Sequence, residues 1–512
     1  MCPYLQEVKR SLPRILALFD TDPLSSSFGL GDRRYWAWCL MDFGNGTYQG
    51  VVNGLSILLE SGLLPEEFSS SLMSERIEYI IRGTSKLIRS DGSLEEAFPF
   101  EGSFCVTALV AYDFISALEL VGDTYHETKR KEFISIVEPM IHFLLKADET
   151  HAIISNHLAT ALAALVKWED LTGQSVFKRA KQLRDRIIEN QSSEGWFSEY
   201  GGFDPGYQSL CTYYLAEASR VSPQLELLEP LRKSIKFLWH FAHPDGSFGG
   251  YYGSRNTRFF YPGGLEALAT EIPEAASLAS FMRESIKKQR VVTLASIDEP
   301  NLIPTFNSYC LAASLSKVPV KKALPIFRQN FQINFPYAGL IIDHGTRHHT
   351  IVSTNKGGVV YHFIDKKLKI INTGLAARST SGRYYSTQTL DPSNLVGLKD
   401  GVISIDCKFL PVLRKLPTPF QFMGLRFLNL TIMRIYKLRE WIKQILVKYL
   451  ITGKGKVIGR NYRKIKLGED LRIDDTPILP SHLKKVELDK PFSSIHMASQ
   501  GYWQVQDEQT PA

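Results

Sequence analysis

Four short segments combine acids, bases and aromatic residues at spacings that suit proton-transfer chemistry. They are Ser155–His157, Glu194–Gln208, Gly253–Arg258, and the acids Glu95, Glu96 and Glu101. Removing a proton beside a carboxylate, as at C5 of a uronic acid, needs one group that holds the carboxylate and another that takes the proton. Asn, Arg or a protonated acid can do the first, and Tyr or His can do the second.

These requirements assign a role to each candidate. Asn156 and Arg255 would hold the carboxylate, Tyr207 would transfer the proton, and His157 would assist. Substrate-binding candidates are the remaining polar and aromatic residues of the same segments, Glu199, Trp196, Tyr200, Asp204, Gln208, Tyr251, Asn256 and Arg258. Further aromatic residues that could stack on sugar rings are Phe197, Phe203 and Tyr252.

Each candidate also has an ordinary structural interpretation. Asn156 could simply cap a helix, because Asn is a favoured N-cap residue. His157 could be a hydrogen-bonded core residue, and Tyr207 could be a packed aromatic beside a turn. We nevertheless expect Asn156, His157, Glu199, Tyr207 and Arg255 to face one cleft, since all lie near the starts of predicted apolar helices.

Those helices belong to a sixfold repeat over the first three hundred residues. Each repeat opens on an acidic turn residue, and the openings are 49, 57, 46, 51 and 53 residues apart. A fixed period of this length indicates one repeated unit of two helices, an all-round apolar helix inside and an amphipathic helix outside. The sequence therefore predicts a six-hairpin α/α toroid. The opening residues are Asp42, Asp91, Asp148, Glu194, Asp245 and Asp298.

The pattern changes after the toroid. From Phe331 onward, short alternating β-branched runs are separated by turn signals, which indicates an antiparallel β-sandwich. The predicted fold class is multidomain, α and β. We expect an N-terminal extension at 1–34, a catalytic toroid at 35–323, a β-sandwich at 324–496 with a basic helical insertion at about 409–450, and a flexible tail at 497–512.

Positive charge is concentrated near that insertion. Residues 411–466 hold fourteen Lys or Arg against one acid, Glu440, or 14 − 1 = +13, whereas the whole chain carries +7. Such a segment favours an anionic partner, either a membrane surface or a charged glycan. The alternative is a solvated helix face packed against the toroid rim. Nucleic acid is not expected, since no supporting fold signature accompanies the charge.

Other features of the sequence indicate where the protein is located and whether it binds a cofactor. The six cysteines are scattered without metal-ligand spacing, so we interpret them as small buried hydrophobes. No signal peptide or membrane span is predicted, and we expect a cytoplasmic protein that could contact a membrane peripherally. No cofactor is expected. Asp343–His349 is rich in metal-capable side chains, but the adjacent His348 and His349 would point to opposite faces of a strand, which disfavours a metal site.

The toroid followed by a β-sandwich, with the Asn156-His157 pair and the segment from Glu199 to Tyr207-Gln208, resembles the heparinase II/III-like and alginate-type polysaccharide lyases. The resemblance implies that Asn156 neutralises a substrate carboxylate, that His157 is catalytic, and that Tyr207 is the acid and base. The sequence departs from the family's pattern at Gly201-Gly202, at Asp204-Pro205, and at Gln208, where the family usually has His. Such lyases are also commonly exported.

Three function classes follow. The first is a lyase or C5-epimerase that acts on an anionic, uronic-acid-containing polysaccharide or oligosaccharide. The second is a glycoside hydrolase with paired carboxylates, for which Glu96, Glu199 and Asp204 are candidates. The third is a non-catalytic glycan-binding protein of a surface-polysaccharide pathway.

Overall fold

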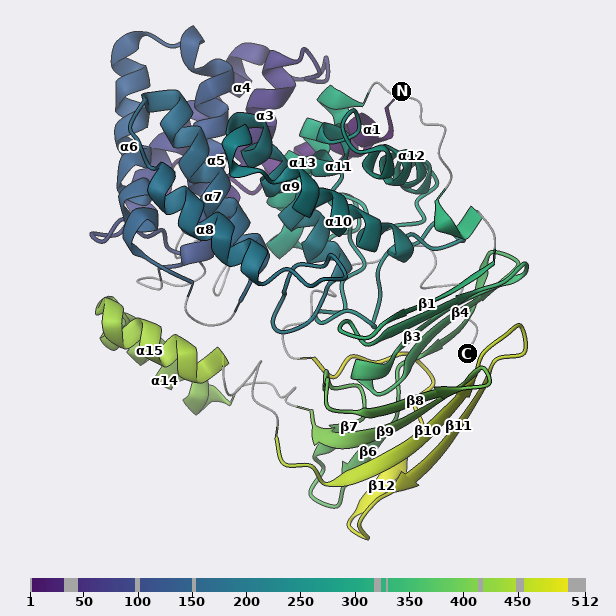
Figure 1. Cartoon of the computed structure of the whole chain (residues 1–512). Helices are drawn as coiled ribbons and strands as arrows, with labels where there is room; N and C mark the ends of the chain where they lie inside the picture. Colours follow the sequence, from purple (N-terminus) through teal and green to yellow (C-terminus); the bar gives the residue numbers. More distant parts are fainter. Residues whose placement is uncertain are drawn as a thin grey trace.

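The computed structural model describes residues 2–31, 45–96, 102–149, 153–316, 324–327, 330–412, 418–447 and 455–495. A block of helices is followed by antiparallel sheets, with a helical hairpin inserted between two strands of the second sheet (Figure 1). The predicted fold class is confirmed. The first repeat opening, at Asp42, lies outside the described residues, as do Glu101 and the predicted tail.

Six apolar helices form the inner ring. Each contacts the next in chain order, and the last contacts the first, so the ring is closed. These helices are buried nearly all round because their residues are apolar or small on every face. They are α3 (Val51–Glu60), α5 (Phe104–Val121), α7 (Ser155–Thr172), α9 (Pro205–Val221), α11 (Gly263–Ala267) and α13 (Glu299–Leu315), with α2 (Gly46–Gln49) leading into α3.

The outer layer is made of amphipathic helices, one beside each inner helix. Five follow their inner helices in sequence: α4 (Ser70–Thr84), α6 (Glu127–Lys146), α8 (Phe177–Glu189), α10 (Leu228–Leu238) and α12 (Pro273–Lys287). Short 3-10 turns lie at their ends: η1 (Ser85–Leu87), η2 (Gly122–Thr124), η3 (Pro223–Leu225) and η4 (Trp239–Phe241).

The sixth outer helix comes from the N-terminus. Helix α1 (Pro3–Leu16) packs against α12 and α13 and completes the last pair. Its apolar residues recur on one helical face and are fully buried: Tyr4, Val8, Leu12 and Ile15. Residues 3–16, which we predicted to lie in an N-terminal extension, therefore pack as the sixth outer helix of the ring.

The acidic residues that open the second and fifth repeats, Asp91 and Asp245, are turn residues. Asp91 Oδ1 accepts hydrogen bonds from the backbone N and Oγ of Ser93, and Asp245 makes the same pair with Ser247. The glycine after each acid has a positive φ, +85° at Gly92 and +95° at Gly246. Glycine adopts this conformation without strain, which explains the recurring acid-glycine pair. The repeat signature thus encodes turns between an outer helix and the next inner helix.

Two antiparallel sheets follow η5 (Pro325–Phe327). The first has the order β1-β2-β3-β4-β5, and the second has the order β11-β10-β9-β7-β6-β12, with β8 also paired to β9. The first contains β1 (Phe331–Phe335), β2 (Leu340–His344), β3 (His348–Ser353), β4 (Val359–Ile364) and β5 (Lys367–Asn372), with η6 (Thr354–Lys356) after β3. The second contains β6 (Ala376–Ser379), β7 (Tyr384–Ser386), β8 (Leu395–Lys399), β9 (Val402–Pro411), β10 (Gly459–Lys466), β11 (Arg472–Ile478) and β12 (Leu483–Val486).

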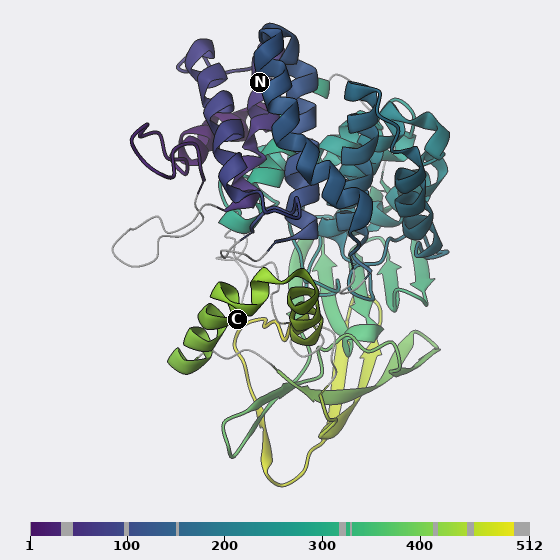
Figure 2. The same cartoon turned by 90° about the vertical axis from the view of Figure 1, so that its left-hand side faces the viewer.

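The first sheet is sandwiched between the ring and the second sheet (Figures 1 and 2). Along β2, Leu340 and Ile342 join the core of the ring, whereas Ile341 joins Ile405 and Ile465 of the second sheet. Alternate residues of a strand point to opposite faces, so one strand contributes to both cores. The β-domain is thereby packed directly on the ring.

Helix α5 is more apolar than we expected. With the following turn, Phe104–Thr124 is long and apolar enough to cross a membrane by length and composition alone, contrary to the sequence analysis. In the ring, however, 83% of its most apolar window is buried by neighbouring helices. Buried core helices share this composition, so the apolar run is explained by its place in the inner ring. The cytoplasmic location stays a prediction.

Candidate active site at the N-terminal ends of the inner helices

Three loops that precede inner helices are joined by hydrogen bonds. The backbone N of Ser155 donates to the carbonyl of Ser198 at 3.1 Å, and Ser254 Oγ donates to the carbonyl of Glu199 at 2.8 Å. The backbone N of Ser254 also donates to the carbonyl of Phe203. These bonds bring the segments around Asn156, Glu199 and Arg255 together, although about fifty residues separate one from the next.

Asn156 and Glu199 form a buried pair. Asn156 Nδ2 donates to Glu199 Oε2 at 2.8 Å. Asn156 does not cap α7, because Ile154 is the N-cap residue and makes no side-chain capping bond. Burial raises the pKa of Glu199 to about 7, against the opposing effects of His157, Arg255 and Asn156. At neutral pH this carboxyl group is therefore partly protonated and can serve as a hydrogen-bond donor.

His157 lies between a carboxylate and a thiol. Its Nδ1 is 2.7 Å from Glu149 Oε2, and its ring is in hydrogen-bonding contact with Cys105. Burial lowers the pKa of His157, but Cys105 and Glu149 outweigh burial and leave that pKa well above the ordinary value. The raised pKa favours the imidazolium form of His157. Burial raises the pKa of Cys105, and His157 opposes this increase.

This cluster was missed in part. Cys105 was interpreted as a buried hydrophobe, yet it is half-buried in the first turn of α5, beside His157. Glu149 follows the opening acid Asp148, and its proximity to His157 in sequence was the one signal that could have indicated the pair. Nothing in the sequence places Cys105 there, since it belongs to the preceding repeat.

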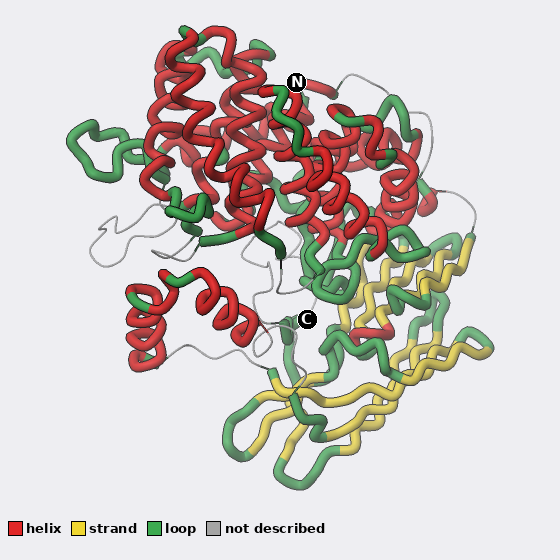
Figure 3. The backbone as a smooth tube through the Cα atoms, turned by 60° about the vertical axis from the view of Figure 1, so that its left-hand side comes forward, coloured by secondary structure: helices red, strands yellow, loops and turns green. Residues whose placement is uncertain are grey.

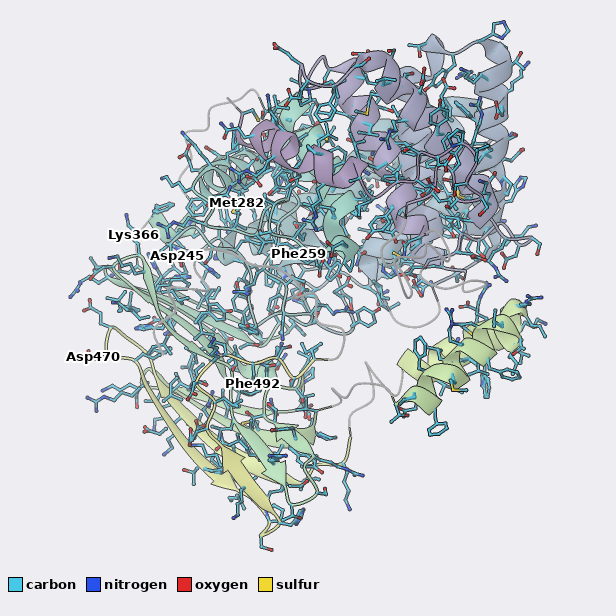
Figure 4. All side chains as sticks on the ribbon, turned by 180° about the vertical axis from the view of Figure 1, so that it is seen from behind. Asp245, Phe259, Met282, Lys366, Asp470 and Phe492 are labelled. Carbon is cyan, nitrogen blue, oxygen red and sulfur yellow. The ribbon has the colours of Figure 1, made fainter. Side chains whose placement is uncertain are left out.

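Arg255 lies over two tyrosine rings. Its guanidinium carbon is 4.7 Å from the centre of the Tyr200 ring and 5.6 Å from that of Tyr207. Tyr207 also packs edge-on against Phe259, which lies on the side of the ring that faces the sheets (Figure 4). Burial raises the pKa of Tyr200, and the cations of His157 and Arg255 oppose this increase. Both phenol rings therefore adjoin a buried positive charge.

Three predicted substrate-binding residues instead hold the fold together. Asp204 is fully buried, caps α9 through the backbone N of Tyr207, and accepts further bonds from Arg255 N and from Thr257. Gln208 donates to Ser234 on α10. Asn256 is fully buried and is bonded to Lys356 and to Ser493 of the β-domain.

Asp204, Gln208 and Asn256 thus bond within the chain, and their assignment to substrate stays a prediction. The physical reason is the same in each case. A buried polar group must be hydrogen-bonded, and each of these side chains makes bonds within the chain that stabilise a helix start or an interface.

The predicted sugar-stacking aromatics separate into two groups. Phe197, Phe203 and Tyr252 are buried in the core, where Phe203 stacks on Phe241, so they cannot contact a substrate. Trp196 and Tyr251 are half-buried, as is the predicted substrate-binding residue Arg258. Trp196 Nε1 donates to Glu194, which in turn accepts from the backbone of the turn between β1 and β2. The guanidinium of Arg258 lies 5.8 Å from the centre of the Tyr251 ring.

The acids before α5 lie at the edge of this cluster. Glu95 is 3.8 Å from Arg89 Nη1, and Glu96 is half-buried and close enough to Cys105 to act on its pKa. Because Asp204 is enclosed and fully hydrogen-bonded, it cannot act as the second carboxylate of a hydrolase. Of the three carboxylates predicted for a hydrolase, Glu96 and Glu199 remain as candidates.

The histidine-rich segment divides as its strand position predicts. His348 Nε2 is 2.9 Å from Asp343 Oδ2, whereas His349 points to the other face and is buried beside Phe363. In the described ranges, no group of three or more His, Cys, Asp or Glu side chains could hold a metal ion.

A cavity of about 530 Å³ lies at the opposite end of the ring, where the inner helices end. Buried Lys167 projects into it between Glu119 and Glu217, beside Tyr112 and Tyr213. None of the predicted site residues lines this cavity. It is thus separate from the cluster around Glu199.

Comparison with known proteins identifies no family. No protein-family model matches the chain, and no curated protein matches it. Among solved structures, the chain is similar to heparinase III, with a TM-score of 0.48, 10% identity, and coverage of 93% of this chain and 78% of that one. It is also similar to a chondroitin AC lyase of Streptomyces coelicolor A3, with a TM-score of 0.48, 9% identity, and coverage of 80% and 66%. A sugar epimerase from a ruminal bacterium has a TM-score of 0.41, 12% identity, and coverage of 62% and 100%.

Proposed function

We propose that the chain is a lyase-like or epimerase-like enzyme that abstracts the C5 proton of a uronic acid in an anionic glycan. The observation that carries this proposal is the Asn156–Glu199 pair, with its 2.8 Å hydrogen bond and a Glu199 pKa of about 7. A neutral carboxyl group and an amide side by side can both donate hydrogen bonds to a substrate carboxylate. Those bonds strengthen as the carboxylate gains charge during deprotonation.

The surrounding residues supply the other parts of the reaction. The cations of buried Arg255 and half-buried His157 stabilise negative charge in the same region. Tyr207 is the principal proton-transfer residue, because its ring lies under Arg255 and it is half-buried at the start of α9. Tyr200 is a substrate-binding residue on the other side of the same guanidinium.

The steps balance without a reactant other than the glycan and water. Tyr207, as the phenolate that the nearby Arg255 cation favours, takes the C5 proton, and the electron pair of the C5–H bond moves onto the carboxylate held by Asn156 and Glu199. In a lyase, this pair then forms the C4–C5 double bond while the C4–O bond breaks, and the leaving oxygen takes the proton from Tyr207. In an epimerase, a proton from water reaches C5 from the opposite face, Tyr207 releases its proton to water, and no glycosidic bond breaks.

A direct assay distinguishes these reactions from hydrolysis. Uronic-acid polysaccharides would be incubated with the protein in deuterated buffer, and ultraviolet absorbance and proton NMR would be recorded. We expect either a rising absorbance from the C4–C5 double bond, or deuterium at C5 of an intact polymer. Chain cleavage with neither signal would contradict the proposal and favour a hydrolase, with Glu96 and Glu199 as its carboxylates. A saturable complex with no reaction would favour the glycan-binding protein.

A further inference from the structure

A pair of helices between β9 and β10 stands apart from both sheets. It consists of α14 (Pro419–Leu430), η7 (Ile432–Arg434) and α15 (Tyr436–Val447). We name residues 418–447 the basic hairpin. Figures 1 and 3 show it beside the end of the ring that faces the sheets, separate from both sheets. Each helix packs mainly on the intervening turn η7.

The basic hairpin exposes large apolar side chains at helical spacing. On α14, Phe420 is 84% exposed, and Met423 and Phe427 are each 66% exposed. On α15, Trp441 is 59% exposed and Ile445 is 46% exposed. Positions three, four and seven residues apart lie on one helix face, so each helix carries an apolar stripe. Such contiguous exposure marks a surface that binds a partner.

Positive charge accompanies these stripes. Residues 418–447 contain five basic residues against one acid, Glu440, which is 5 − 1 = +4. Arg439 is buried, and the other four basic residues are Arg426, Arg434, Lys437 and Lys443. The combination of bulky apolar side chains and basic residues on short helices suits the boundary between lipid headgroups and acyl chains.

The basic hairpin is fixed to the ring near the candidate active site. Arg439 is fully buried, and its Nη2 is 3.1 Å from Asp91 Oδ2 in the loop before α5. Its guanidinium packs against Gly102, two residues before α5 begins. Arg89 Nη2 also donates to the carbonyl of Arg434 at 3.4 Å. We considered, as an alternative to an anionic partner, that this segment packs on the rim of the toroid. Such packing explains the burial of Arg439, but it leaves the apolar stripes exposed.

We propose that the basic hairpin docks on a membrane that contains anionic lipids. Charge complementarity selects an anionic partner, and the exposed aromatic and aliphatic side chains select lipid over a charged glycan, which offers no apolar interior to receive Phe420, Phe427 or Trp441. The buried Arg439–Asp91 contact then holds the N-terminal ends of the inner helices close to the bilayer. This inference does not depend on the proposed function.

Vesicle flotation tests this docking. The full chain would be mixed with vesicles of phosphatidylcholine alone, or of phosphatidylcholine with 30% phosphatidylglycerol, at low and high salt. We expect recovery with the anionic vesicles at low salt, at least about five-fold above neutral vesicles, and a decrease at high salt because ions screen the charge. A variant with Phe420→Ser, Phe427→Ser and Trp441→Ser should lose this recovery.

The matched control replaces two equally exposed apolar residues on the β-domain, Leu395→Ser and Ile478→Ser, and should float like the wild type. Light scattering of each protein alone would show whether the hairpin binds a second copy of the chain. The proposal is overturned by equal recovery with both vesicle types, by unchanged flotation of the triple hairpin variant, or by hairpin-dependent dimers that do not float. Retention on heparin beads without flotation would overturn it in favour of a charged glycan.

Discussion

At the residue scale, the proposed reaction depends on the protonation of Glu199. Because its pKa is raised to about 7, Glu199 is protonated below this pH and ionised above it. If the protonated form holds the substrate carboxylate, kcat/KM should fall as the pH rises through about 7. Glu199→Gln keeps a neutral hydrogen-bond donor at the same place, so the fall should disappear while much of the activity at lower pH remains.

Rate profiles from pH 5 to 9 for both proteins provide the measurement. Glu127→Gln, a change of the same kind at an exposed position on α6, is the matched control and should keep the wild-type profile. If kcat/KM of Glu199→Gln still falls as the pH rises through 7, a group other than Glu199 causes the loss of activity at high pH.

Other residue identities were ambiguous in the sequence for a physical reason. Asn156 and Asp204 both stand near helix starts, where the same side chains can cap a helix or bind a ligand. The structure shows that Asp204 is the cap and that Asn156 is not. The cluster of Cys105, His157 and Glu149 joins side chains from two neighbouring repeats, so it follows from ring closure and not from local sequence.

At the element scale, the turns that open the repeats should be sensitive to a single methyl group. Gly92 has a φ of +85°, and an added Cβ would lie 2.1 Å from the carbonyl oxygen of Pro139. Gly92→Ala should therefore lower the free energy of unfolding by at least about 1 kcal/mol. Gly424→Ala, in α14 with no neighbour within 4 Å, should instead leave it unchanged or raise it by up to about 1 kcal/mol. Urea denaturation of both variants measures the difference, and equal stabilities would contradict the assignment of a structural turn.

The interface between the ring and the first sheet should be sensitive to acid. Burial lowers the pKa of His240 to about 4 and that of His243 to about 3. The unfolded chain binds these protons near pH 6.5, so stability is complete above that pH and is lost as the pH falls toward the folded-state values. His240 alone should contribute a loss on the order of 3 kcal/mol by pH 4.

Urea denaturation at pH 7, 5.5 and 4.5 tests this dependence. His240→Phe keeps an aromatic ring against Phe331 and Phe335 but cannot be protonated, so its stability should vary less with pH than that of the wild type. His142→Phe, at an exposed position on α6, should not change how the free energy of unfolding depends on pH. If the free energy of unfolding depends on pH in the same way for the wild type and for His240→Phe, then His240 does not control acid stability.

At the scale of the whole molecule, the repeat and the change from helical to alternating patterns predicted the architecture well. Both are local periodicities, which a sequence displays directly. The sequence could not reveal that α1 closes the ring, because its partner α13 lies about three hundred residues away and any amphipathic helix would present the same pattern. Likewise, Asn256 and Lys356 meet only because the first sheet packs on the ring.

Comparison of two tyrosine variants tests whether Tyr207 transfers the proton, as we propose. Tyr207→Phe and Tyr200→Phe each remove one oxygen from a ring that contacts Arg255, so their effects on packing are matched. Turnover of the uronic-acid glycan would be measured for both, with folding checked by circular dichroism. We expect turnover to fall by about 10²-fold or more for Tyr207→Phe and by less for Tyr200→Phe. Full turnover by Tyr207→Phe would show that Tyr207 does not transfer the proton.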